Sequence, residues 1–363
     1  MSGRIGGGDR YATAALVAEA FAADLPAGAV PGVVVASGED AAGGIDALSA
    51  TFLAGHVGAP VLLTARDRLP APTRDAAAAL LGGSGGGSGG GSSAGAGAGA
   101  GAGRTVHVMG GPAVVADAVL DHLRELLPGA QVVRVQGGDR YATAAAAARL
   151  GAASIAPRAL LAGSPAARTA LVASGTNPAD GLSAGPLAYA GRVPLLLTAR
   201  DALPDATRSA LRDLGIAQVV VLGGSAVVSS RVLDALAADG LEVVVAAGAT
   251  RYDTAAVLLA LASAPQAGAG AATGPGGVAG FGLGFADAAQ GYLVNGVRFP
   301  DALASGPLAG SRQRPLYLTA PSGLSGETAG ALAATATSSV TAIGLAGAVP
   351  DAVLEAADAA ARA

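Results

Sequence analysis

Three arginines stand in nearly identical surroundings along the chain, and they are the residues best suited to bind a ligand. The stretch GGDRYATA carries Arg10 and returns unchanged around Arg140, while a looser copy, GATRYDTA, carries Arg251. A tyrosine follows each of them, and we include these tyrosines among the candidate ligand-binding residues: Tyr11, Tyr141 and Tyr252. The planar guanidinium suits carboxylates and phosphates. The pattern indicates either three positions that hold an anionic ligand or three arginines that tie neighbouring repeats together through a carboxylate or carbonyls.

The other residues of the octet predict a turn from a strand into a helix. Its two glycines permit a tight turn, and Asp139 is a suitable N-cap because its carboxylate can accept hydrogen bonds from the first helical turn. An arginine at a helix start lies near the positive end of the helix dipole, which is unfavourable for a lone cation. We therefore expect a carboxylate, a cluster of carbonyls or a bound anion beside each arginine.

Residue types that support catalysis do occur, but not in suitable settings. The glycine-rich stretches MGGPAVV and LGGSAVV do not match G-x-G-x-x-G, so we interpret them as tight turns. The three histidines share no repeat position and no ligand spacing, and the chain has no cysteine, so no metal site is predicted. Three aspartates do recur, and we expect them to be helix N-caps rather than general acids or bases: Asp46, Asp180 and Asp301. No catalytic residue and no cofactor is predicted.

The elements around the arginines repeat three times. After each octet come an apolar run with a small polar turn, a D-(A/G)-L-(S/A) segment, a P-(V/L)-(L/Y)-L-T segment and a valine-rich run with a glycine turn, always in this order. The short Val/Leu runs are typical of buried parallel strands, and the Ala/Leu segments between them of helices. The sequence predicts an α/β protein of three tandem similar units, each a small parallel sheet of about four strands covered by helices. We expect the units to surround a pseudo-threefold axis.

We divide the chain into repeats at 1–131, 132–242 and 243–363. The glycine-rich insertions at 82–103 and about 268–284 are expected to be disordered, since they have few side chains to bury. The first strand is only a stub at Arg4-Ile5, and the C-terminal helix is not followed by the closing strand that the first two repeats have.

Composition excludes several functions. A net charge of −4 argues against non-specific nucleic-acid binding. An apolar run of about 18 residues is missing, so we expect no membrane insertion, and the N-terminus does not have the pattern of a signal peptide. Few aromatic residues, and no tryptophan, disfavour a lectin that stacks sugars on exposed rings.

The motifs GGDRYATA, DGLSAGPLA, PLLLT and VVVLGGSAVVS, taken together and in order, resemble the cell-wall-binding repeat 2 family of bacterial surface proteins. The resemblance covers nearly the whole chain apart from the glycine-rich insertions. It implies a cell-wall or extracellular location, non-covalent anchoring to an anionic secondary cell-wall polymer, and a monomer whose three repeats form an internal pseudo-trimer.

The resemblance also implies ligand-binding residues. The octet arginines and an apolar triplet before a threonine are implicated in polymer contact, and the triplets map to Val61, Leu62, Leu63, Leu195, Leu196, Leu197, Leu316, Tyr317 and Leu318. The third repeat departs most from the pattern, with Ala249-Thr250 in place of Gly-Asp. Two alternatives stay open: a structural or protein-interaction module of the cell surface, and an α/β protein that binds a small ligand.

Overall fold

The computed structural model describes residues 3–39, 44–82, 103–158, 160, 165–264, 280–283, 285 and 287–363. Within these ranges no helix is long and apolar enough to cross a membrane. Both glycine-rich insertions lie mostly outside the described residues, so their predicted disorder stays a prediction. At the end of the second insertion Phe281 is fully buried, and its N–H donates to the carbonyl of Leu261. This part of the insertion therefore belongs to the core.

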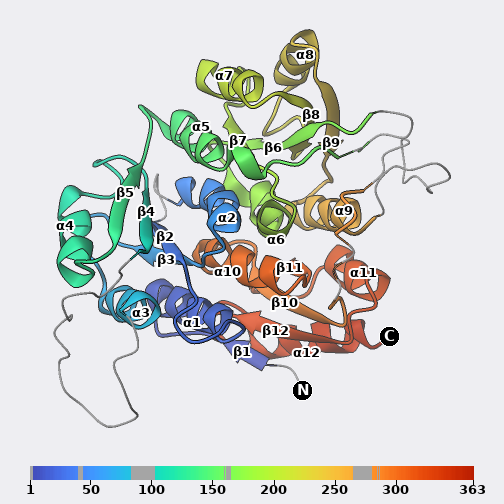
Figure 1. The fold of residues 1–363 in the computed structure, drawn as a ribbon. Helices are drawn as coiled ribbons and strands as arrows, with labels where there is room; N and C mark the ends of the chain where they lie inside the picture. The colour runs from blue at the N-terminus through green and yellow to red at the C-terminus, as the bar shows by residue number, and fades with distance from the viewer. Residues whose placement is uncertain are drawn as a thin grey trace.

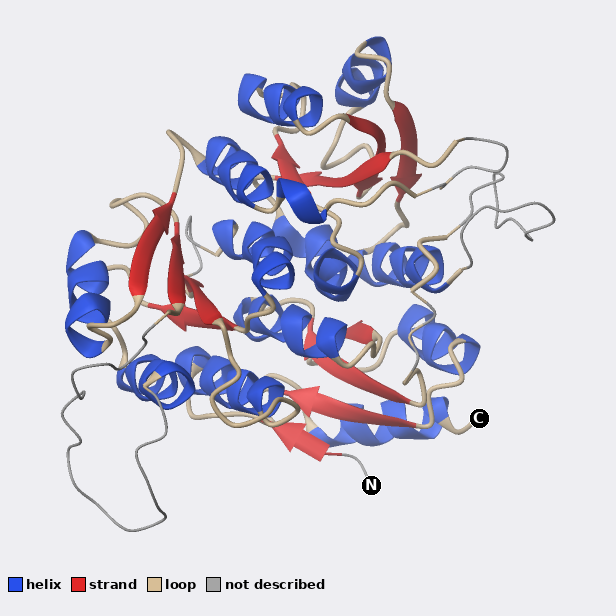
Figure 2. Ribbon diagram, in the orientation of Figure 1, coloured by secondary structure: helices blue, strands red, loops and turns tan. Residues whose placement is uncertain are grey.

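The described strands form three separate parallel sheets of four strands each, which confirms the predicted fold class (Figures 1 and 2). The first sheet has the order β3–β2–β4–β5, with β2 at Gly32–Ser37, β3 at Val61–Thr64, β4 at Thr105–Met109 and β5 at Gln131–Val135. The second has the order β7–β6–β8–β9, with β6 at Arg168–Ser174, β7 at Leu195–Thr198, β8 at Ile216–Leu222 and β9 at Glu242–Ala246. The third has the order β11–β10–β12–β1, with β10 at Gln290–Asn295, β11 at Leu316–Thr319, β12 at Ser339–Ile343 and β1 at Gly3–Ile5.

Helices connect the strands and cover the sheets. Those that start in the octets are α1 (Arg10–Ala22), α5 (Arg140–Leu150) and α9 (Arg251–Ser263). The helices after β2, β6 and β10 are α2 (Asp46–Val57), α6 (Gly185–Ala190) and α10 (Pro300–Ser311). The 3₁₀ helix η2 (Pro178–Ala184) directly precedes α6. The outer helices are α3 (Ala71–Leu81), α4 (Asp117–Leu126), α7 (Asp205–Asp213), α8 (Ser230–Ala238), α11 (Gly326–Ala334) and α12 (Asp351–Ala361), and a short 3₁₀ helix η1 spans Ala152–Ser154.

The strand before each octet completes the sheet of the preceding repeat. Strand β5 pairs with β4, and β9 pairs with β8, although each leads directly into the octet of the next repeat. The predicted divisions at 131/132 and 242/243 therefore fall within these closing strands or at their edge. A division by sheets instead runs from an octet helix to the strand that precedes the next octet.

The N-terminal stub closes the third sheet. Strand β1 pairs with β12 in parallel, with Arg4 opposite Ala342. The guanidinium of Arg4 donates to the carbonyl of Gly344 at 2.8 Å and to Asp351 at 2.6 Å. In the first sheet Arg134 makes the same two contacts, to the carbonyl of Gly110 and to Asp117, each at 2.7 Å. The strand that seemed missing at the C-terminus is thus supplied by the other end of the chain.

Three equivalent helices meet at the centre of the molecule. Helices α2, α6 and α10 contact one another pairwise, and each octet helix lies against a neighbour's central element: α1 on α10, α5 on α2 and α9 on η2 (Figure 1). The close approach depends on small residues, because a Cβ atom added at Gly306 would lie 2.8 Å from the Cα of Gly185 and from Thr51. The repeats are therefore joined through one continuous core.

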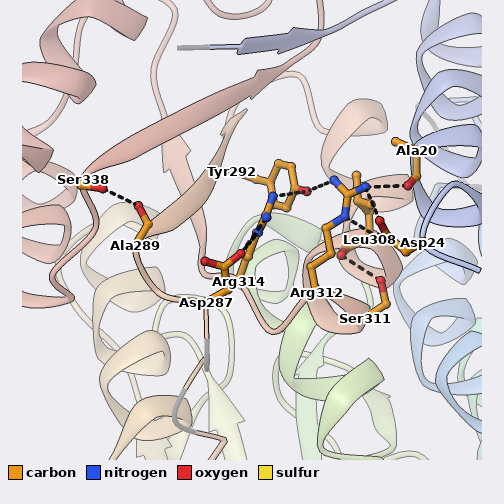
Figure 3. Close-up of polar contacts among 10 residues, drawn as sticks. All are labelled: Ala20, Asp24, Asp287, Ala289, Tyr292, Leu308, Ser311, Arg312, Arg314 and Ser338. Carbon is orange, nitrogen blue, oxygen red and sulfur yellow. Dashed lines mark hydrogen bonds and ion pairs between the residues drawn. The ribbon is translucent and has the colours of Figure 1, made fainter. Parts of the chain in front are cut away.

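Arg312 links the last repeat to the first on the side of the strand starts. At the end of α10 its guanidinium donates to Asp24 at 2.6 Å, to the carbonyl of Ala20 at 2.7 Å and to the hydroxyl of Tyr292 at 2.8 Å (Figure 3). Arg314 pairs with Asp287 beside the same tyrosine (Figure 3). Charge-assisted bonds of this kind are stronger than neutral ones, so this contact strengthens the attachment of the third repeat to the first.

Candidate binding clefts between the repeats

The octets form the strand-to-helix turn that the sequence predicts. Asp9 and Asp139 are N-caps whose carboxylates accept from the N–H groups of Ala12 and Ala142 at 2.7 and 2.8 Å. In the third repeat Thr250 takes over this role and forms a capping box with Asp253. The N-cap predicted for Asp139 is confirmed, and the departure in the third repeat preserves the cap with a different residue.

The octet threonine closes the turn. The first glycine of each octet donates its N–H to a threonine hydroxyl: Gly7 to Thr13 at 3.2 Å, Gly137 to Thr143 at 3.1 Å and Gly248 to Thr254 at 3.2 Å. These threonines are buried. The start of each octet helix is thereby held in one geometry, which fixes where the neighbouring arginine lies.

Each octet arginine reaches a backbone carbonyl at the end of a neighbouring strand. The Nη1 of Arg140 donates to the carbonyl of Gly175 at 2.7 Å, and that of Arg251 to the carbonyl of Gly296 at 2.6 Å. Arg10 donates to the carbonyl of Gly38 in the same way. Of the partners expected beside an arginine at a helix start, the structure therefore shows a carbonyl. All three arginines are half-buried.

The octet tyrosines pack against the same glycines. A Cβ atom added at Gly175 would lie 2.5 Å from Cε1 of Tyr141. Cβ atoms added at Gly38 and Gly296 would lie 3.0 and 3.1 Å from Cε1 of Tyr11 and Tyr252. Burial raises the pKa of Tyr11 and of Tyr252 above its ordinary value. The tyrosines thus pack the arginine-bearing helix against the end of the strand.

Two open clefts lie where one repeat meets the next. The cleft of about 380 Å³ between the third and first repeats is lined by Gly7, Gly8, Asp9, Arg10, Thr13, Arg298, Pro300, Asp301, Leu345, Gly347 and Ala348. The cleft of about 480 Å³ between the second and third repeats is lined by Asn177, Ala179, Asp180, Gly224, Ala226, Val227, Gly248, Ala249, Thr250, Arg251, Tyr252 and Val297. We call them the Asp301 cleft and the Asp180 cleft.

Both clefts occupy the position where α/β proteins bind ligands. The Asp301 cleft lies beyond the carboxyl ends of β10 and β12, where the chain order of the third sheet reverses. The Asp180 cleft has the same relation to β6 and β8 in the second sheet. Open parallel sheets bind ligands in the crevice at such a switch point, because helix starts and loops converge there. The octet helix of the next repeat supplies the third wall of each cleft.

The recurrent aspartates are not N-caps, and this expectation was wrong. The N-cap positions of α2 and α10 are Ile45 and Phe299, and neither α2 nor α10 has a side-chain cap bond. Asn177, not Asp180, caps η2. The carboxyls instead face the glycine turns that follow β4, β8 and β12, each in the same sheet as its aspartate.

These glycine turns leave just enough room for the aspartates. Gly110, Gly223 and Gly344 all have positive φ values, near 100°. A Cβ atom at these positions would lie 2.9, 2.5 and 2.7 Å from Oδ2 of Asp46, Asp180 and Asp301. The glycines are therefore required by both backbone conformation and space. Recurrence of the aspartates was the available sequence signal, but the contact with a distant turn could not be read from it.

Burial disfavours ionisation of two of these carboxyls. It raises the pKa of Asp46 from its ordinary 3.8 to about 7, and nearby Arg140 offsets this only in part. Burial likewise raises the pKa of Asp301 to about 6, against the opposing effects of a hydrogen bond from Thr13 and the charge of Arg10. Both aspartates thus face an octet residue of the next repeat.

The apolar triplets lie inside the sheets. Their residues begin strands β3, β7 and β11, and each residue is at most 3% exposed: Val61, Leu62, Leu63, Leu195, Leu196, Leu197, Leu316, Tyr317 and Leu318. The hydroxyl of Tyr317 is hydrogen-bonded within the third repeat, to Thr337 at 2.6 Å. In this structure the triplets contribute to the core, and a ligand contact by these side chains stays a prediction.

The clefts combine groups that can contact negative charge, hydroxyl groups and apolar surface. Arginine and the N–H groups of a helix start attract negative charge. The aspartate carboxyl offers hydrogen bonds to hydroxyls, and the rim includes exposed apolar side chains, Leu345 at 45% and Val297 at 50% exposure. Among the described residues no group of three or more histidine, cysteine, aspartate or glutamate side chains is placed to hold a metal ion.

The comparison with protein families matches all three repeats. The family described as cell wall binding domain 2 (CWB2) matches residues 4–120, 134–233 and 246–354. Each match begins within the strand before an octet, which pairs with the preceding sheet, and ends in the helix α4, α8 or α12, so the matches follow the sequence repeats and not the sheets.

Individual relatives extend beyond this chain. It is 25% identical to the N-acetylmuramoyl-L-alanine amidase LytC of Bacillus subtilis (strain 168) over 317 residues, which are 87% of this chain and 50% of LytC. The fold is similar to that of Cwp6 from Clostridium difficile, with a TM-score of 0.75 at 19% identity over all of this chain and 48% of Cwp6. Cwp8 from the same organism gives a TM-score of 0.71 at 21% identity, over 99% of this chain and 51% of Cwp8. The chain spans about half the length of these relatives.

Proposed function

The chain belongs to the cell wall binding domain 2 family, and from this premise we propose that it is a non-catalytic module that attaches to an anionic secondary polymer of the bacterial cell wall. The proposal places the protein at the cell wall, outside the membrane. It also assigns the two clefts between repeats as the sites that hold the polymer.

The observation that carries the proposal is the placement of the octet arginines. Arg10 and Arg251 each line a cleft at the switch point of a sheet, at the start of a helix whose dipole also favours an anion. One guanidinium nitrogen of each donates to a backbone carbonyl, which positions the side chain at the cleft. An anionic group in the cleft would therefore meet a positioned positive charge, with little ordering cost on binding.

Repetition suits a polymer ligand. A polymer that enters one cleft raises its own effective concentration at the next, so weak sites act together. We expect Arg140 to serve the junction between the first and second repeats in the same way, since it repeats the contacts of the other two arginines. The amidase activity named for LytC is that protein's own, and it forms no part of this proposal because the chain spans only half of LytC.

Sedimentation with purified cell walls tests the function. The chain is mixed with walls before and after their secondary polymers are removed chemically, and the bound fraction is measured as salt is varied. We expect binding to intact walls, loss of binding to stripped walls, and weakening by salt because the contact is electrostatic. Equal binding to stripped and intact walls would show that the ligand is not a secondary polymer.

A further inference from the structure

We propose that Asp301, together with Asp46 at the equivalent place in the first repeat, couples ligand binding to protonation. Each carboxyl holds a proton when an anionic group lies beside it, and it donates a hydrogen bond to that group. The inference rests on the proposed function, because the anionic group is that of the wall polymer. It adds a requirement that the family membership does not contain: the site takes up protons as it binds.

Asp301 is placed to contact whatever fills its cleft. It lines the cleft with Arg10 and Arg298, and one of its oxygens lies against the turn at Gly344. The hydroxyl of Thr13, which accepts from the N–H of Gly7, lines the same cleft. An anion bound near Arg10 would lie close to this carboxyl. Two neighbouring anions repel, and this repulsion is removed when the carboxyl is neutral.

Asp46 repeats the arrangement in a more buried setting. Its side chain is only 3% exposed, and its Oδ1 has no hydrogen-bond partner. Its Oδ2 lies against the turn at Gly110. An ionised carboxylate with an unpaired oxygen is costly in such a place, whereas a protonated carboxyl can donate to an acceptor that arrives from outside.

The charges around the two carboxyls set the pH range. Arg10, Arg298 and Asp9 share the cleft with Asp301, while the Gly344 turn contributes only uncharged residues to it. Asp46 faces Arg140 and Asp139 of α5 and its N-cap. Burial outweighs the arginines in both cases and raises the pKa to about 6 for Asp301 and about 7 for Asp46. An added anion favours the neutral form further, so proton uptake falls between pH 6 and 8.

The test compares wall binding by the full chain at pH 5.5 and pH 8. One variant combines Asp46→Asn with Asp301→Asn, which keeps the shape and removes the titration. A control of equal net charge combines Asp75→Asn with Asp201→Asn, two exposed aspartates that line neither described cleft. Circular dichroism verifies that each variant is folded at both pH values.

We expect the parent and the control to bind up to about tenfold more weakly for each pH unit between 6 and 8, because each site takes up about one proton. The Asp46→Asn/Asp301→Asn variant should bind with the same affinity at both pH values and more tightly than the parent at pH 8. Binding by the parent that does not change with pH, or a variant that follows the parent, overturns the proton coupling alone. A parent that binds at neither pH overturns the proposed function and the coupling with it.

Discussion

Asp46 is a carboxyl whose ionisation lowers the stability of the folded chain. Its pKa rises on folding from the ordinary 3.8 to about 7, because burial removes it from water. Both states are protonated below about pH 4, and above this the unfolded chain releases the proton first. Stability associated with this group is therefore fully present below pH 4 and is lost as the pH rises through 7.

We predict that Asp46→Asn raises the free energy of unfolding at pH 8 and changes it little at pH 4. Asparagine keeps the shape and cannot ionise, so it avoids the burial cost of the carboxylate. Urea unfolding of parent and variant at the two pH values measures the difference. A variant that is destabilised equally at both pH values would mean that the carboxylate, and not the acid, is the form that the fold accommodates.

The recurrent aspartates also show where residue-level prediction fails. Asp139 was correctly predicted as an N-cap, because its partner lies three residues away in the same turn. Asp46, Asp180 and Asp301 were predicted as caps on the same grounds, yet their partners are glycine turns more than 40 residues further along the chain. A residue's type and its neighbours predict local hydrogen bonds, but not which distant turn the fold brings to it.

Among the elements, the central helices depend on glycine where they cross. Gly306 in α10 meets Gly185 at the start of α6, and neither position has room for a methyl group. Gly330 lies in α11 with no atom near the place of a Cβ. The same substitution should therefore have opposite effects at these two helical positions.

We predict that Gly306→Ala lowers the free energy of unfolding by about 1–3 kcal/mol, the usual cost of overpacking a core. Gly330→Ala, the matched control, should raise it by about 0.5–1 kcal/mol, because alanine has the higher helix propensity. Denaturant unfolding of both variants gives the two signs. Equal stabilisation by both would disprove the close crossing of α6 and α10.

The positions of helices and strands were easier to predict than which strands pair with each other. Strand and helix positions follow from apolar runs and the repeated octet, and the structure confirms parallel sheets of four strands. The pairing of β1 with β12 was missed, because the two strands lie more than 330 residues apart and the stub at Arg4-Ile5 has no local signal of its partner. The burial of the triplets follows from their apolar character, although the family resemblance pointed to a ligand role.

For the whole molecule, closure by β1 makes the repeats nearly equivalent around a ring. Residues 127–130 connect α4 to β5, and a direct fusion of Ala363 to Met1 would connect α12 to β1 through the same number of residues, 362, 363, 1 and 2. Arg4 and Arg134 hold the two closing strands through equivalent bonds. The fused connection should therefore have a length that the fold already uses.

We predict that a circular permutant that begins at Gly129 and ends at Pro128, with Ala363 joined to Met1, folds like the parent. Its three sheets keep every strand, and β5 becomes the N-terminal strand as β1 is now. Its thermal midpoint should stay within about 4 °C of the parent, a difference of about 3 kcal/mol for a chain of this length. A permutant that is insoluble, or that unfolds many degrees lower, would show that chain order and not ring closure determines the fold.

The central claim is that the octet arginines hold an anionic wall polymer. Its most direct test is sedimentation with cell walls of a variant that combines Arg10→Lys, Arg140→Lys and Arg251→Lys, which keeps the charge and loses the planar fork. The control combines Arg74→Lys, Arg124→Lys and Arg212→Lys at exposed positions. With all variants verified as folded, we predict parental binding by the control and at least about tenfold weaker binding by the octet variant, since the sites act together. An octet variant that folds normally and binds walls as well as the parent would contradict the account.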